Sequence, residues 1–406
     1  MVDVRASKAA PFYLIFILQF VGIATQNCPS PCFCKGHFEV YCNNTGISEI
    51  PKGIPKETTV LDLGGNKIKK IPYGILNGLL NLTFIGLEQL GFTGNEIEAG
   101  ALNLPNLTEV DLSFNRYMMV PPNLPKAMSR MYFFYNPIEV LDARSFNDYP
   151  SLEYFDMSNC HITHIKPNTF DALVNVNTMH IAFTKLTNAG VPDGVFAKNT
   201  KLDYLNLRFN HLNGLLKGLP SSLENIDYVG NPIKEIPSNA FEDLPHLKTL
   251  GFWNSALSKI DDNAFAGLVN LTILDFMSAA ITSPVTNNTF SGLPSLQTLY
   301  LDDNHVPSID IGALRDLKSL TSLWLSGNNL STLDEEVLDT KYIPNLNTLF
   351  IDFNPWYCDC DLRWLREKVG NASYVIQDPH LIVCHGPEKV AGKPWDELKP
   401  EDFVCN

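Results

Sequence analysis

The chain has 406 residues, 45% of them hydrophobic, which is enough to bury a large core in several domains or in one elongated array. Its formal net charge at pH 7 is −14. This charge argues against binding of nucleic acid or heparin, because phosphate and sulfate contacts need a basic stripe and the sequence contains no run of lysine or arginine.

Residues 1–24 have the pattern of a secretory signal peptide. Arg5 and Lys8 precede an apolar stretch from Pro11 to Ala24, and small residues suited to cleavage follow. A membrane anchor is the alternative, but a stretch of about 14 apolar residues is too short to cross a bilayer comfortably. Because no second apolar run of spanning length occurs, we expect a secreted protein without a membrane span.

Residues 25–57 form a cysteine-rich segment directly before the first repeat. Its spacing is Cys28-x3-Cys32-x-Cys34-x7-Cys42. Secretion would place these thiols in an oxidising compartment, where paired cysteines form disulfides. Four cysteines allow three pairings, and the spacing alone does not choose among them.

The secretory route also predicts an N-glycosylated surface. The sequence contains seven Asn-x-Ser/Thr sequons, and seven in a chain with a signal-peptide pattern suggest more than chance. The acceptor residues are Asn43, Asn81, Asn106, Asn270, Asn287, Asn329 and Asn371.

Residues 58–356 repeat the template L-x-x-L-x-L-x-x-N-x-L. Clear copies are LTEVDLSFNRY from Leu107, LDYLNLRFNHL from Leu202 and LTSLWLSGNNL from Leu320. The copies lie 21 to 26 residues apart, which is the leucine-rich-repeat period, and so many aligned copies argue against coincidence. They begin at residues 58, 82, 107, 128, 152, 176, 202, 223, 247, 271, 296, 320 and 346.

The template predicts the architecture. Successive residues of a strand point to opposite sides, so template positions 4 and 6 turn inward and position 5 turns outward. Each repeat adds one short strand, and both ends need caps because one repeat cannot bury its own apolar face. We predict an α/β solenoid: a curved array of about 13 leucine-rich repeats with a concave parallel β-sheet and disulfide-bonded caps at both ends.

Template position 9 ends each strand, and an asparagine there can bond backbone groups that would otherwise be buried unpaired. Cys160 holds this position in the repeat from Leu152, so we interpret it as buried structural filler. A mixed disulfide, a nucleophile or a metal site with His161 and His164 is the alternative, but His161 falls at an outward position, and we expect no metal. The position-9 asparagines are Asn66, Asn115, Asn136, Asn210, Asn231, Asn304, Asn328 and Asn354.

A second periodic residue is a phenylalanine farther along the repeats, in contexts such as NAFEDL and NTFSGL. These residues predict a stacked aromatic spine under the convex side, and an aromatic ligand groove is the alternative. They are Phe146, Phe170, Phe196, Phe241, Phe265 and Phe290.

Residues 357–406 follow the last repeat and carry Cys358, Cys360, Cys384 and Cys405. A Cys-x-Cys pair also suits half of a zinc site or a redox pair. A zinc site would need paired spacing and usually a reducing compartment. We therefore expect structural disulfides that close the open end of the solenoid.

With both cysteine-rich ends in view, the chain resembles extracellular leucine-rich-repeat proteins, especially the small leucine-rich proteoglycans and chondroadherin-like matrix proteins. The resemblance rests on the N-terminal cysteine pattern, on the stretch NPWYCDCDLRWLREKV, and on a rhythm in which a short repeat precedes two longer ones. It implies the disulfides Cys28–Cys34, Cys32–Cys42, Cys358–Cys384 and Cys360–Cys405.

Two features depart from this pattern. The longest repeat has 26 residues, so the elongated penultimate repeat of many such proteoglycans is missing. The expected mature N-terminus also lacks an acidic Ser-Gly cluster, which puts a glycosaminoglycan chain in doubt. The C-terminal cysteine pattern is shared with Slit-like proteins and Toll-like ectodomains.

The outward template positions 3, 5 and 7 combine aromatic, arginine and aspartate residues, as protein-binding surfaces do. The alternative is that some rings only pack against each other along the sheet. An acidic stripe of Asp111, Asp156, Asp227 and Asp275 would favour a basic partner. The predicted ligand-binding residues are Arg130, Tyr132, Phe134, Tyr154, Asp156, His180, Tyr204, Arg208, Trp253, Asp275, Tyr300 and Trp324.

These features predict a secreted, non-enzymatic protein of the extracellular matrix or pericellular space. Its expected partner is a collagen, matrix or growth-factor-type protein bound at the concave face, with a homodimer as a further arrangement and with no cofactor, metal or nucleic acid. A secreted pattern-recognition or guidance and adhesion protein, Toll-like or Slit-like, is the alternative. An enzyme is least favoured, because the sequence contains no G-x-S-x-G, Walker or H-E-x-x-H motif.

Overall fold

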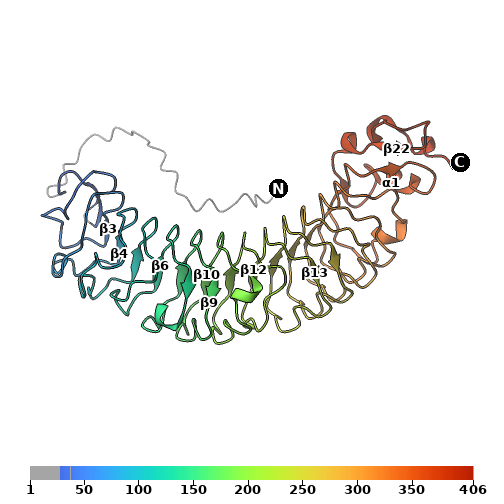
Figure 1. The fold of residues 1–406 in the computed structure, drawn as a ribbon. Helices are drawn as coiled ribbons and strands as arrows, with labels where there is room; N and C mark the ends of the chain where they lie inside the picture. Colours follow the sequence, from blue (N-terminus) through green and yellow to red (C-terminus); the bar gives the residue numbers. More distant parts are fainter. Residues whose placement is uncertain (1–27, 37, 406) are drawn as a thin grey trace.

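The computed structural model describes residues 28–36 and 38–405. Figure 1 shows a curved array of repeated turns. A segment that contains two disulfides lies at each end of this array. The predicted signal peptide, residues 1–24, lies outside the described residues. No helix in the described part of the chain is long and apolar enough to cross a membrane.

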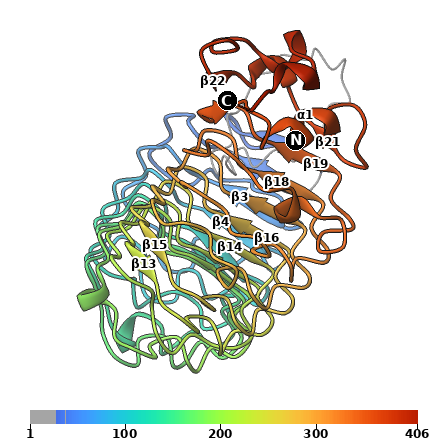
Figure 2. The ribbon, with the colours of Figure 1, turned by 90° about the vertical axis from the view of Figure 1, so that its right-hand side faces the viewer.

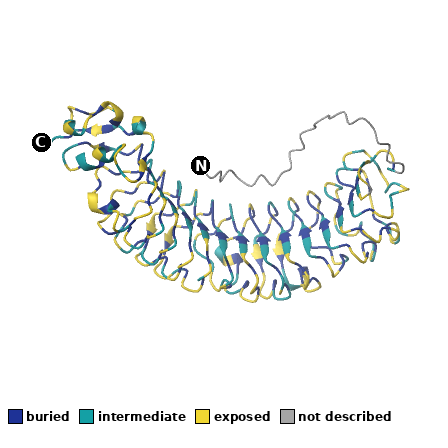
Figure 3. Ribbon diagram, turned by 180° about the vertical axis from the view of Figure 1, so that it is seen from behind, coloured by how far each residue is buried: buried dark blue, intermediate teal, exposed yellow. Residues whose placement is uncertain are grey.

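Each of the thirteen predicted repeats contributes one three-residue strand at template positions 3 to 5, and neighbouring strands pair in parallel and in register. In most of them the middle residue is buried and its two neighbours are half-buried (Figure 3). The strands are β3 (Val60–Asp62), β4 (Phe84–Gly86), β5 (Glu109–Asp111), β6 (Arg130–Tyr132), β8 (Tyr154–Asp156), β10 (Thr178–His180), β11 (Tyr204–Asn206), β12 (Asn225–Asp227), β14 (Thr249–Gly251), β16 (Ile273–Asp275), β17 (Thr298–Tyr300), β18 (Ser322–Trp324) and β19 (Thr348–Phe350).

The cysteine-rich ends extend this sheet to sixteen strands. At the N-terminal end, β1 (Phe33–Lys35) pairs antiparallel with β2 (Glu39–Tyr41), and β2 pairs in parallel with β3. At the other end, β21 (Val375–Ile376) pairs in parallel with β19. The predicted curved solenoid with disulfide-bonded ends is confirmed.

The opposite side of the repeats is built from turns. Short parallel pairs occur there, β7 (Val140–Leu141) with β9 (His164–Ile165) and β13 (Glu235–Ile236) with β15 (Lys259–Ile260). Figure 2 shows β13 and β15 apart from the main sheet. The 3-10 turns of the repeats are Ala143–Ser145, Asn188–Gly190 and Glu335–Leu338.

Among the described residues the one α-helix, α1 (Arg363–Lys368), belongs to the C-terminal segment rather than to a repeat. The helical part of the predicted α/β architecture is therefore reduced to this helix and to 3-10 turns. The C-terminal segment also contains β20 (Trp356–Tyr357), β22 (Cys384–Gly386) and the 3-10 turns Pro379–Leu381, Trp395–Glu397 and Pro400–Asp402.

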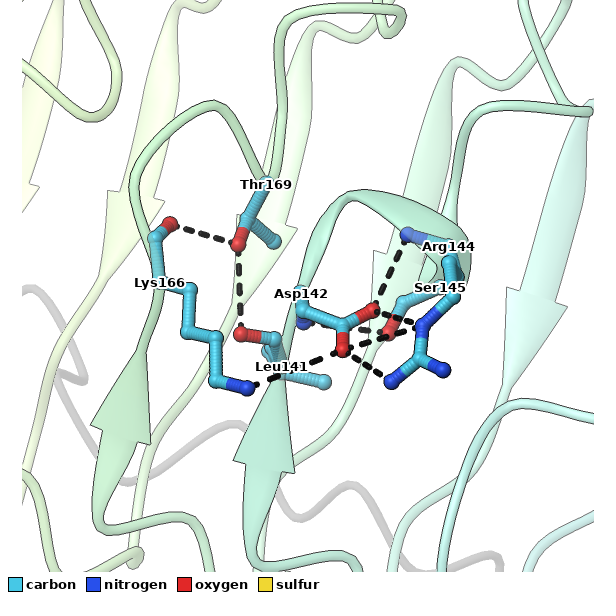
Figure 4. Close-up of polar contacts among 6 residues, drawn as sticks. All are labelled: Leu141, Asp142, Arg144, Ser145, Lys166 and Thr169. Atoms are coloured by element: carbon cyan, nitrogen blue, oxygen red, sulfur yellow. Dashed lines mark hydrogen bonds and ion pairs between the residues drawn. The ribbon is translucent and has the colours of Figure 1, made fainter.

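Polar contacts fasten the turns of adjacent repeats to each other (Figure 4). The Asp142 carboxylate accepts the backbone N–H of Arg144 at 3.0 Å and a guanidinium N–H of the same residue at 2.6 Å. Thr169, one repeat later, donates its hydroxyl to the carbonyl oxygens of Leu141 and Lys166. The Lys166 ammonium lies 4.0 Å from the Asp142 carboxylate.

The predicted aromatic spine is buried, and its spacing explains the curvature. The ring centroids are 5.6 Å apart for Phe146 and Phe170, 5.2 Å for Phe170 and Phe196, and 6.0 Å for Phe265 and Phe290. Neighbouring strands of a sheet lie only about 4.8 Å apart. Because the spine side is wider than the sheet side, the array bends so that the sheet forms the concave face.

The eight position-9 asparagines are all buried, and each joins its repeat to the preceding turn of the array. Asn115 shows the pattern: its amide donates to the carbonyl oxygens of Leu87 at 2.9 Å and Leu112 at 3.0 Å. Its side-chain oxygen accepts the backbone N–H groups of Leu90 at 3.1 Å and Phe92 at 3.0 Å. The predicted role of these residues is confirmed.

Cys160 is buried, and its thiol donates to the Phe133 carbonyl oxygen at 3.3 Å. Burial raises the pKa of Cys160 to about 12, so the reactive thiolate is scarce at neutral pH. His161 is exposed, as its register position indicates. The structure thus supports the filler interpretation.

The remaining cysteines form four disulfides, with the same partners that the family resemblance implies: Cys28–Cys34, Cys32–Cys42, Cys358–Cys384 and Cys360–Cys405. In the C-terminal segment, the buried rings of Trp356 and Trp395 cover the last layer of the core. The Arg366 guanidinium donates to the carbonyl oxygens of Trp395 and Leu398 and so holds the segment together.

Replacement of a position-9 asparagine should destabilise the array. Asn115→Ala leaves three backbone carbonyl groups and two backbone N–H groups without their side-chain partner, so we expect it to lower the free energy of unfolding by about 2–3 kcal/mol. Urea unfolding measures this change. Cys160→Asn is the matched comparison and should cost less than about 1 kcal/mol, because the register suits asparagine there. Equal losses in the two variants would contradict the assigned role.

Candidate functional site on the concave face

All twelve predicted ligand-binding residues are half-buried, and they lie on strands of the sheet or in the turns that directly follow them. They do not form one site. The structure divides them into a central aromatic ladder, an arginine–aspartate pair beside it, and a separate aromatic cluster toward the C-terminal end.

The aromatic ladder consists of Tyr132, Tyr154, His180 and Tyr204, which alternate between template positions 5 and 3 on β6, β8, β10 and β11. Successive ring centroids lie 5.3, 5.3 and 5.2 Å apart. This spacing follows from the strand spacing, because rings on neighbouring strands meet as cross-strand pairs. The ladder therefore runs along the array, perpendicular to the strands.

Arg130 is anchored at the N-terminal end of the ladder. Its guanidinium lies 4.4 Å from the ring centroid of Tyr154, a cation–π geometry, and donates to the Tyr132 hydroxyl at 3.1 Å. That hydroxyl donates to the Glu109 carboxylate at 2.8 Å. Sequence reasoning missed Glu109, although its template position 3 on β5 could have indicated it.

The four rings of the ladder are uncharged at neutral pH, and the neighbouring Arg130 carries a positive charge. Burial raises the pKa of the Tyr132, Tyr154 and Tyr204 phenols. Burial also lowers the pKa of His180, and the Asp156 carboxylate opposes this shift only partly. A neutral His180 accepts the side-chain amide of Asn206, 3.1 Å from its Nδ1. The ladder thus presents preordered neutral rings with hydrogen-bonding edges.

The acidic stripe has a structural role as well. The carboxylates of Asp111, Asp156, Asp227 and Asp275 each accept the backbone N–H two residues further on, at 2.8 to 3.1 Å. Burial raises the pKa of Asp111, Asp227 and Asp275. Arg208 forms an ion pair with Asp227 at 2.5 Å. Part of the acidic stripe therefore stabilises the turns that follow the strands by accepting their backbone N–H groups.

The other predicted residues lie apart from the ladder. Phe134 contacts Phe114 and Tyr135, with ring centroids 4.7 and 5.3 Å away. Tyr300 and Trp324 form the C-terminal cluster, in which Trp324 stacks on Phe350 at 3.6 Å. Trp253 and Asp275 lie on the repeats between the two groups.

Glu88, a residue that sequence reasoning did not select, lies at the N-terminal end of the concave face. Burial, and next the nearby charge of Asp62, raises the pKa of Glu88 to about 8. Gly64 makes room for it, because a Cβ at that position would collide with the Glu88 carboxyl group. The signal in the sequence is an acid at template position 7 between Gly64 and Ser113, which hold position 7 of the two neighbouring repeats.

Comparison with known proteins agrees with this geometry. The family description "Leucine rich repeat" matches residues 221–281, 245–306 and 294–355, and a second one of the same name matches residues 151–173. The chain is a leucine-rich-repeat protein. In the described part of this leucine-rich-repeat protein, no group of three or more His, Cys, Asp or Glu residues is placed to hold a metal ion.

Its relatives include small leucine-rich proteoglycans, so the predicted resemblance is confirmed. Podocan of Mus musculus is 27% identical over 332 residues, which are 81% of this chain and 50% of Podocan. Osteomodulin of Bos taurus is 30% identical over 229 residues, 56% of this chain and 48% of Osteomodulin. The chain spans about half the length of the curated relatives that it matches.

A third relative is the leucine-rich repeat transmembrane protein FLRT2 of Rattus norvegicus, 28% identical over 404 residues, 97% of this chain and 52% of FLRT2. In a solved octameric complex of Latrophilin 3, Unc5D and the leucine-rich repeats of FLRT2, one chain matches with a TM-score of 0.64 and 25% identity, covering 93% of this chain and 99% of that one. A Toll–Spatzle complex of Drosophila, at a TM-score of 0.54 and 18% identity, shares the fold alone.

The protonation of Glu88 predicts a pH effect on stability. Folding raises the pKa of Glu88, so the protonated side chain contributes to the stability of the folded state. This contribution is complete below the ordinary glutamate pKa of 4.5 and is lost as the pH rises through about 8. Relative to Glu88→Gln, the unsubstituted protein should therefore lose stability between pH 5 and pH 9. Urea unfolding at the two pH values measures the difference.

The exposed Glu57 provides the control for this measurement. Glu57→Gln measures the effect of removing an exposed carboxylate over the same pH range. A stability difference for Glu88→Gln that stays constant between pH 5 and pH 9 would show that Glu88 is ionised in the folded protein.

Proposed function

We propose that the chain is a secreted, non-enzymatic binding protein of the extracellular matrix or pericellular space, and that its concave face recognises a basic region of another extracellular protein. Collagen, matrix proteins and growth-factor-type proteins are the expected partner classes. The central observation is the ladder of neutral rings from Tyr132 to Tyr204, held in place by Arg130 and bordered by carboxylates.

The charges of the concave face support a basic partner. Template positions 3, 5 and 7 of the thirteen repeats carry nine acidic side chains and only two arginines. Both arginines already have carboxylate partners, Arg130 with Glu109 at 3.6 Å and Arg208 with Asp227. A lysine or arginine of a partner could pair with the remaining carboxylates and lie on the faces of the rings.

The positions of the sequons support the same region. Six of the seven acceptor asparagines are exposed, and Asn43 is half-buried. No sequon occurs between Asn106 and Asn270. The repeats in this interval carry the whole ladder, so N-glycans attached at the predicted acceptors would begin outside it.

An adhesion or guidance function is the second candidate. The observation that favours it is the match to FLRT2, which covers almost the whole of this chain and, in the solved complex, almost the whole of that one. That complex contains Latrophilin 3 and Unc5D beside FLRT2. A partner for this chain would then be a receptor ectodomain rather than a matrix polymer.

Truncation of the ladder should weaken partner binding. In Tyr154→Ala/Tyr204→Ala we expect binding to weaken at least tenfold, because both changes remove ring faces from the centre of the surface. Surface plasmon resonance with the purified full chain would measure it against fibrillar collagens, basic growth factors and receptor ectodomains. Binding to collagens or growth factors would favour the matrix function, and binding to receptor ectodomains would favour the adhesion function.

Tyr73→Ala is the matched control, because this tyrosine is 69% exposed and lies outside the ladder. It should leave binding unchanged, and circular dichroism should show all variants folded. Binding that survives in the ladder variant, or a preference for acidic partners at the ladder, would refute the proposed site.

A further inference from the structure

A second surface follows the edge of the sheet where the strands end. We define the rim as the side chains at template positions 8 and 10 of the five repeats that begin at residues 107 to 202. It comprises Phe114, Arg116, Tyr135, His161, Phe183, Lys185, Phe209 and His211, together with Pro137 and Asn159. Seven of these ten residues are exposed, and Phe209, Pro137 and Asn159 are half-buried.

Template position 8 has an unusual backbone. In all thirteen repeats this residue has a positive φ, between 51° and 70°. Residues with a Cβ avoid this left-handed region, and glycine, asparagine and aspartate tolerate it best. The array nevertheless places aromatic residues there five times, and four of the five lie within the rim, at Phe114, Tyr135, Phe183 and Phe209.

Packing buries only part of these rings. They form two stacked pairs, Phe114 with Tyr135 at 4.7 Å and Phe183 with Phe209 at 4.6 Å. Stacking and partial burial offset part of the cost of the left-handed backbone. Phe114, Tyr135 and Phe183 nevertheless remain 46–50% exposed, so a large part of each ring faces solvent.

Cationic and imidazole side chains lie next to the rings. Position 10 of the same repeats carries Arg116, His161, Lys185 and His211, all exposed. The backbone N–H groups of Arg116 and Lys185 donate to the preceding repeat, at 2.7 and 2.9 Å, so the row has a fixed spacing. Neither of these two side chains has an ion pair among the residues that the structure describes.

The rim is also free of carboxylates. Positions 7 to 11 of these five repeats contain no aspartate or glutamate, although the whole chain has a net charge of −14. They contain no sequon either. Their charge is therefore opposite to that of the concave face, and a ligand of the rim must have chemistry different from that of a ligand of the ladder.

We propose that the rim binds an acidic, extended segment of a partner protein. The rows cross five repeats, a length of about 20 Å at the usual strand spacing, and an extended chain of about six residues covers that length. Its carboxylates pair with Arg116 and Lys185, and its apolar side chains lie on the two stacked ring pairs. This surface is independent of the ladder and does not require the function proposed for it.

The test uses a property of position 8. Asparagine suits a positive φ better than phenylalanine does, so Phe114→Asn/Phe183→Asn should fold with unchanged or higher stability and still lose the rings. The probe is a fluorescent peptide with three copies of Glu-Leu-Asp-Phe, whose anisotropy is measured with the full chain. We expect at least tenfold weaker binding in this variant and in Arg116→Glu/Lys185→Glu.

Phe353→Asn is the matched control, since Phe353 has φ 55° and is 67% exposed but lies outside the rim. This variant and the ladder variant should bind the peptide as the unsubstituted protein does. A peptide in which lysine replaces both acids should not compete. Three results would overturn the proposal: a loss of stability in Phe114→Asn/Phe183→Asn, equal peptide affinity in all variants, or binding of heparin fragments without binding of the acidic peptide.

Discussion

The structure depends on the pairing of backbone groups that a parallel stack of three-residue strands cannot pair by itself. Each strand is short, so the chain leaves the sheet after a few residues and would bury free N–H and carbonyl groups in the following turn. In eight of the thirteen repeats one buried asparagine supplies both a donor and an acceptor at that point. Asn115 and its equivalents thereby connect these repeats to the turn before them, and the leucine core forms between layers that are already aligned.

The curvature, and with it the candidate site, follows from a difference between the spacing of the phenylalanine rings and the spacing of the strands. The phenylalanine spine requires more space per repeat than the hydrogen-bonded sheet, so the sheet becomes the inner surface. Rings on neighbouring strands then lie close enough to contact one another, which orders Tyr132, Tyr154, His180 and Tyr204 without a ligand. A partner that binds there meets side chains whose conformational freedom is already restricted, and this lowers the entropic cost of association.

The repeat register predicted most of the fold because it depends on residue type at fixed spacing. Strand positions, the asparagines, the aromatic spine and the role of Cys160 all follow from counting. The candidate site was less predictable, because a template shows which way a residue points but not what it meets there. Phe134 turned out to contact Phe114 and Tyr135 instead of the ladder, and Asp111 and its equivalents bond the backbone. The left-handed position 8 is also invisible to hydrophobic periodicity.

The parallel, in-register sheet has a further consequence for the spacing of functional groups. Each repeat advances the array by one strand, so the distance between the ladder and the Trp324 cluster is set by the number of repeats between them, and the array works as a molecular ruler. Loss or gain of a repeat in that interval would move the two groups by one strand spacing and leave each intact. Length variation could thus retune which partners reach both groups while the contact chemistry stays the same.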